Sequence, residues 1–81
     1  MTKMEFEKLL DEATAGDVES MHKLVVLCFK MAEGSLNAGN TEKATIYMEL
    51  GNGWKSLSEH GTGKVSEQIK RLTHNEFSAF F

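Results

Sequence analysis

The sequence contains no proline and a single cysteine, Cys28, among its 81 residues. Without proline, the helices of this chain must be ended by glycine, asparagine or aspartate. One cysteine excludes a scaffold held by intramolecular disulfides and suits a reducing compartment, so we expect a cytoplasmic protein. Long hydrophobic runs are also missing, because the longest apolar stretch, 24–29, has six residues against the roughly 20 of a membrane span. We therefore expect neither a membrane segment nor, given the acidic start, a signal peptide.

The length and composition predict one small globular domain over residues 1–81. Hydrophobic residues make up 41% of the chain and charged residues 26%, which is the balance of a folded protein. A chain of this size buries only about 60% of the surface that it exposes when unfolded. It must therefore pack its elements tightly or gain stability from a partner. The formal net charge of −3 argues against nucleic acid as that partner.

Apolar residues at helical spacing predict an all-α fold. Thr2 followed by Glu5 is the pattern of a capping box, and Gly16 can end the first helix. Asp17 and Thr41 are candidate N-caps for the next two helices. We expect a three- to four-helix up-down antiparallel bundle. Its helices should cover about residues 3–15, 17–38, 41–59 and 64–78.

Two segments break the ordinary pattern of an amphipathic helix. The second helix carries Val26, Leu27 and Phe29 in addition to its regular stripe, so it is apolar over most of its circumference. Such a helix lies in the middle of a domain or offers a second face to something else. The third helix contains Gly51 and Gly53, each costing about 1 kcal/mol relative to alanine. We expect close helix packing at Gly51, or a kink beside it, to explain this cost.

Small and aromatic residues recur at regular spacings in the middle of the chain, namely Ala32, Gly39-Asn40, Glu42-Lys43-Ala44, Tyr47-Met48 and Gly51. With this pattern, residues 25–54 resemble a tetratricopeptide or Sel1-like helix pair. The sequence departs from the family at Cys28 and Ser35, where an aromatic is usual, and no proline closes the unit. The resemblance implies an antiparallel pair of helices. It also implies that Val26, Phe29, Glu33 and Asn37 occupy the family's peptide-facing positions.

These observations favour a non-enzymatic protein-interaction module, a small regulator, adaptor or inhibitor that binds a larger protein or associates with itself. The apolar chain end, 77–81, and the aromatic residues add to the surplus surface of the second helix. The candidate contact residues are Val26, Phe29, Glu33, Asn37, Trp54, Phe80 and Phe81. The alternative for the apolar members of this set is that they simply form the core.

A second interpretation is a DNA-binding regulator with a helix-turn-helix-like segment at 54–74. Its candidate contacts with bases and phosphates are Lys64, Ser66, Gln68, Lys70 and Arg71. Other chemistry finds little support in the sequence. His22, Cys28, His60 and His74 lack the spacing of metal ligands, and Gly63-Lys64 is followed by valine rather than by the serine or threonine of a phosphate-binding loop. We expect no metal, no cofactor and no enzymatic activity.

Overall fold

The computed structural model describes residues 1–60 and 67–81 of the chain. Within them lie four α-helices and a closing 3₁₀ turn: α1 (Lys3–Thr14), α2 (Val18–Asn37), α3 (Thr41–His60), α4 (Glu67–Phe77) and η1 (Ser78–Phe80). Helix accounts for 88% of the described residues, and no strand occurs among them. The all-α class and the antiparallel packing are confirmed. The loop expected after the third helix, and the expected start of the fourth at residue 64, lie outside the described residues.

Side-chain caps fix where the first three helices begin. The hydroxyl of Thr2 accepts a hydrogen bond from the Glu5 amide, and the Glu5 carboxylate accepts one from the Thr2 amide, both at 3.1 Å. Asp17 caps α2 by accepting from the amide of Ser20. At α3 the expected cap was wrong, because the Asn40 side chain accepts from the Lys43 amide at 3.1 Å. Thr41 is thereby the first residue inside the helix.

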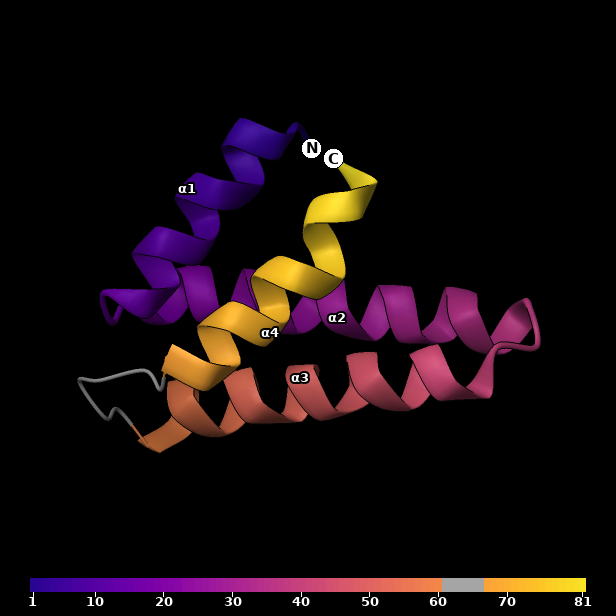
Figure 1. Ribbon diagram of the computed structural model, residues 1–81. Helices are drawn as coiled ribbons and strands as arrows, with labels where there is room; N and C mark the ends of the chain where they lie inside the picture. The colour runs from indigo at the N-terminus through magenta and orange to yellow at the C-terminus, as the bar shows by residue number, and fades with distance from the viewer. Residues whose placement is uncertain (61–66) are drawn as a thin grey trace.

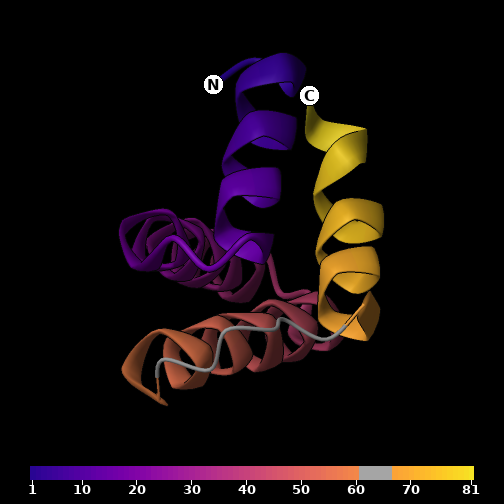
Figure 2. The same cartoon turned by 90° about the vertical axis from the view of Figure 1, so that its left-hand side faces the viewer.

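The helices form two layers. α2 and α3 lie side by side and run in opposite directions, joined by a short turn in which Gly39 adopts a φ of 80° (Figure 1). α1 and α4 lie together on one face of this pair and are steeply inclined to it (Figure 2). They too run in opposite directions, so the two chain ends come close together. One face of the α2–α3 pair is thus covered by the second layer of helices.

Aromatic side chains fill the space between the two layers. Phe6 of α1 and Phe77 of α4 are both fully buried, with ring centroids 5.9 Å apart. Tyr47 of α3 also packs against Phe77, with ring centroids 5.2 Å apart. Trp54, also fully buried, donates a hydrogen bond from its indole N–H to the Thr73 hydroxyl at 2.9 Å. These contacts attach α4 to the rest of the domain.

The two glycines inside α3 are explained by close packing. A Cβ atom at Gly51 would lie 2.8 Å from Cε1 of Phe29 and 3.2 Å from Cβ of Cys28, both on α2. A Cβ atom at Gly53 would lie 2.7 Å from Cδ1 of Ile69, on α4. The first glycine lets α2 approach and the second lets α4 approach. α3 continues as one helix through both positions.

Candidate functional site

A row of apolar side chains follows the outer face of α2. Val18, Val26 and Leu36 are 42%, 53% and 53% exposed, while Val25 and Phe29 are half-buried. Their spacing places them along one side of the helix over most of its length. The adjoining side of α2 supplies Met21, Leu24 and Cys28 to the core. The prediction that α2 is apolar beyond its core stripe therefore holds, and part of the surplus stays exposed.

This row borders a groove between the first half of α2 and the last turns of α3. The groove has a volume of about 320 Å³. His22, Val25, Val26 and Phe29 line it from α2, and Lys55, Ser58 and Glu59 line it from α3. Phe29 is held here because its ring packs against the bare backbone of Gly51. The groove is thus an apolar depression with one cation and one carboxylate on its α3 side.

The other predicted contact residues do not gather at this groove. Glu33 and Asn37 are exposed further along α2, beyond the residues that line the groove. Phe80 is 55% exposed, and its ring lies 6.5 Å from that of Tyr47. Phe81 stacks on Phe6 at 5.1 Å and is half-buried. The apolar chain end thus docks on the core, with Phe80 left at the surface.

Trp54 requires a correction, because its side chain is fully buried and cannot contact a partner in this structure. From the sequence, Trp54 was counted among the aromatic residues that could form a contact surface, with the core as the alternative, and a kink in the third helix was one explanation for its two glycines. Instead α3 is continuous, and the indole points to α4, where Thr73 accepts its N–H. Trp54 therefore holds two helices together.

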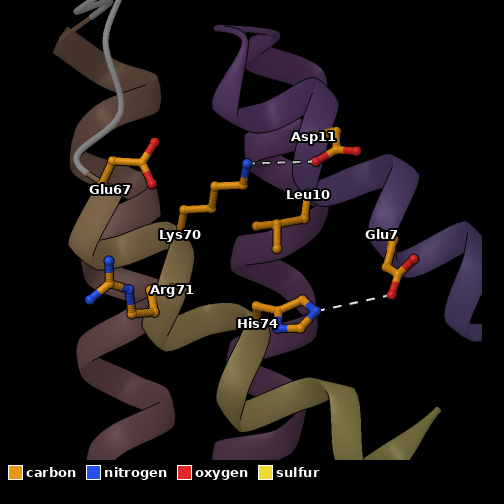
Figure 3. A pocket seen from close by; sticks show the side chains of 7 residues that line it. All are labelled: Glu7, Leu10, Asp11, Glu67, Lys70, Arg71 and His74. Carbon is orange, nitrogen blue, oxygen red and sulfur yellow. Dashed lines mark ion pairs between the residues drawn. The ribbon is translucent and has the colours of Figure 1, made fainter.

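A second depression, of about 310 Å³, lies between α1 and α4 and is dominated by charge (Figure 3). Two ion pairs cross it: Lys70 with Asp11, at 3.8 Å, and His74 with Glu7, at 4.0 Å. Leu10 lies between them at the back of the depression. Both ion pairs are exposed to solvent, so each adds little to stability. They link α4 to α1 across the depression.

The residues predicted to contact DNA lie partly in this second depression. Lys64 and Ser66 fall outside the described residues, and Gln68 is exposed. Lys70 and Arg71 line the depression together with Glu7, Asp11 and Glu67. Carboxylates beside these cations disfavour a phosphate, because they oppose its negative charge. The DNA-binding interpretation stays a prediction that no feature of the described residues favours.

Cys28 is fully buried beneath the α2–α3 contact. Burial raises the pKa of its thiol to about 12, since the thiolate would lose its hydration. A thiol of this kind is protonated at neutral pH and a poor nucleophile. Across residues 1–60 and 67–81, no three His, Cys, Asp or Glu side chains come together as a metal site would require.

A third depression, between α3 and α4, was missed from the sequence. Ile46, Glu49 and Leu50 line it from α3, and Ile69, Leu72 and Glu76 line it from α4. Leu72 is 46% exposed. The sequence assigns Ile69 and Leu72 to the stripe of one helix, but only the placement of α4 against α3 brings them beside Ile46. No local pattern contains that information.

Comparison with known proteins gives no relative: no family model, no curated protein and no solved structure matches this chain. The resemblance of residues 25–54 to a tetratricopeptide-like pair is therefore supported only by its own residues. In the part of the chain that the structure describes, every helix is too short or too polar to pass through a lipid bilayer.

Proposed function

We propose that this protein is a non-enzymatic interaction module that binds another protein, or a second copy of itself, through the outer face of α2 and the adjoining α2–α3 groove. The observation that supports the proposal is the row formed by Val18, Val26 and Leu36, all more than two-fifths exposed. We infer from it a small regulator, adaptor or inhibitor. A cytoplasmic location remains part of this proposal.

The arrangement of these side chains matters more than their number. Single apolar residues are common on protein surfaces and carry no meaning by themselves. Here they recur on one side of a 20-residue helix and lead into a groove that contains Phe29. A partner helix or strand laid along α2 would remove them from water together. Burial of a contiguous apolar patch is what drives most protein association.

The proposal is tested with Val26→Lys, a change at an exposed position that should leave the fold intact. Met4→Lys is the matched control, because Met4 is 80% exposed on α1 and the substitution adds the same charge. Tagged chains of residues 1–81 are cross-linked in the cells that express them, and captured proteins are quantified by mass spectrometry. Sedimentation of the purified chains reports self-association.

We expect a captured protein, or a dimer, that is present with the unmodified chain and with Met4→Lys and is lost with Val26→Lys. Circular dichroism should show equal helix content in all three chains. Identical captured proteins and identical sedimentation for the unmodified chain and Val26→Lys would refute the proposal.

A further inference from the structure

The α3–α4 groove combines an apolar floor with one acidic edge. Ile46 and Leu50 of α3 and Ile69 and Leu72 of α4 supply the floor, and its volume is about 310 Å³. It exists because α4 lies close to α3, where Gly53 leaves room for the Ile69 side chain. The groove faces away from the α2 residues that line the proposed interaction face, and the two depressions share no residue.

The charges at this groove are unbalanced. Glu76 on the α4 side is neutralised by Lys43, whose Nζ lies 2.9 Å from its carboxylate. Glu49 on the α3 side is exposed, and no ion pair forms on it within the described residues. Glu42, also exposed, lies two turns before Glu49 on the same side of α3. The α3 edge of the apolar floor thus carries Glu49, a carboxylate without a partner of opposite charge, and Glu42 adds a second carboxylate along the same side of α3.

We propose that the α3–α4 groove binds a cationic amphipathic helix of a partner protein. Leucine-like side chains on one face of that helix would cover Ile46, Ile69 and Leu72. Lysine or arginine residues beside its apolar face would pair with Glu49 and Glu42. A helix laid in an apolar groove uses side chains one and two turns apart as anchors, which suits a floor shared by two helices.

The sign of the partner's charge follows from the groove's edge. A helix with acidic flanks would bring its carboxylates next to Glu49. The like charges would repel one another, and each carboxylate would lose hydration without gaining a partner of opposite charge. Arg71 precedes Leu72 but lines the depression between α1 and α4, on the other side of its helix. It does not neutralise Glu49.

The probe is a capped synthetic peptide of about 15 residues, a length that can hold a helix. Leucines are placed at i, i+3, i+4 and i+7, with lysines on both flanks. A second peptide carries glutamates in place of the lysines. Binding to the full chain is measured by fluorescence anisotropy at low and high NaCl concentration, because added salt screens the charge contribution.

We expect the lysine peptide to bind at least about tenfold more tightly than the glutamate peptide, with an advantage that shrinks in high salt. Leu72→Lys should weaken lysine-peptide binding about tenfold, the effect of losing one well-buried anchor. Met4→Lys and Val26→Lys add the same charge elsewhere and should leave binding nearly unchanged. Glu49→Lys should reverse the preference between the two peptides.

Several results would overturn the inference. The first is equal affinity of the chain for both peptides, and the second is absence of binding by the lysine peptide. The third is equal weakening of lysine-peptide binding by Leu72→Lys and Met4→Lys, which would show that binding depends only on the net charge of the chain. A dimer that Leu72→Lys dissociates would assign the groove to a second copy instead. If Leu72→Lys loses helix content, Glu49→Lys decides the question. Loss of peptide binding through Val26→Lys alone would place the peptide in the α2–α3 groove, which contradicts this inference and leaves the proposed function standing.

Discussion

The contact between α2 and α3 differs in kind from the attachment of α4. Small buried residues mark the first, with Cys28 and Ala32 on α2 and Ala44 and Gly51 on α3. They let the two backbones approach closely over long helices. At α4, apart from the close approach of Ile69 to Gly53, the contacts are made by a few large or polar side chains. A close backbone contact has little freedom to adjust, whereas a helix attached by a few side chains can be released by changing one of them.

The attachment of α4 depends on a small number of named contacts. Phe77 packs between Phe6 and Tyr47, and the Thr73 hydroxyl accepts the indole N–H of Trp54. Lys43 and Glu76 form an exposed ion pair at the surface. Because the α1–α4 depression and the α3–α4 groove both border this helix, loosening it would alter both. The comparison predicts that α4 can open while the α2–α3 pair stays folded.

The largest effect is expected from Thr73→Val, which keeps the shape of the side chain and removes the hydroxyl. The buried indole N–H of Trp54 then has no acceptor, a loss that costs about 1–3 kcal/mol. We expect faster amide hydrogen exchange throughout α4, with the amides around Cys28 and Gly51 much less affected. Thr73→Ser retains the hydroxyl and serves as the control. An equal increase in amide exchange rates in α2, α3 and α4 would show that the domain opens as one unit. The distinction between the α2–α3 contact and the attachment of α4 would then be wrong.

The difference between local contacts and contacts among distant segments explains which features could be predicted from the sequence. Helix number, the capping box at Thr2 and Glu5 and the Asp17 cap depend on neighbours in the chain, so local patterns were sufficient. The close approach at Gly51 was also expected, because glycine inside a helix is costly without a contact that requires it.

Features of α4 were harder to predict because they depend on how distant segments meet. Trp54 lies 19 residues from its hydrogen-bond partner Thr73, and no spacing rule connects them. The groove with Ile46, Ile69 and Leu72 is missed for the same reason. At the α2 face, the surplus of apolar residues was visible in the sequence, but the exposure of Val26 and the burial of Trp54 follow only from the placement of the layers.

An intermediate effect is expected from replacing the two glycines of α3 with alanine. Each change should gain up to about 1 kcal/mol in helix propensity. At Gly53 the new Cβ meets only the end of the Ile69 side chain, which can rotate away. At Gly51 it meets the Phe29 ring and also Cβ of Cys28, which moves only with the backbone of α2. We expect Gly51→Ala to be less stable than Gly53→Ala by about 1–2 kcal/mol, the range of modest overpacking.

Urea denaturation of both variants and the unmodified chain measures this difference directly. Gly53→Ala should match or slightly exceed the unmodified chain. If Gly51→Ala were the more stable of the two variants, the α2–α3 contact would be adjustable and the distinction between the two interfaces would be wrong.

The smallest effect is expected at the start of α1, where Thr2 and Glu5 cap the helix beside the chain's C-terminal end. The hydrogen bond from the Thr2 backbone amide, followed by that from the Thr2 side chain, lowers the pKa of Glu5 below its ordinary value of 4.5. As the pH falls, the Glu5 carboxylate is thus protonated at a higher pH in the unfolded chain than in the folded chain. The stabilisation by the carboxylate is therefore complete above pH 4.5 and is lost as the pH falls through the lowered pKa.

Glu5→Gln tests this sign, since glutamine can still accept the Thr2 amide but does not titrate. Thermal denaturation between about pH 6 and pH 3 should show the unmodified chain slightly more stable than Glu5→Gln at the upper end. The difference should shrink as the pH falls toward the lower end. Adding Thr73→Val to the unmodified chain and to Glu5→Gln should lower the melting temperatures of both chains equally at each pH. The two effects are independent because the cap acts on α1 and the Trp54 hydrogen bond acts on α4. A constant difference between the two chains at every pH would mean that the Glu5 charge plays no part in the cap.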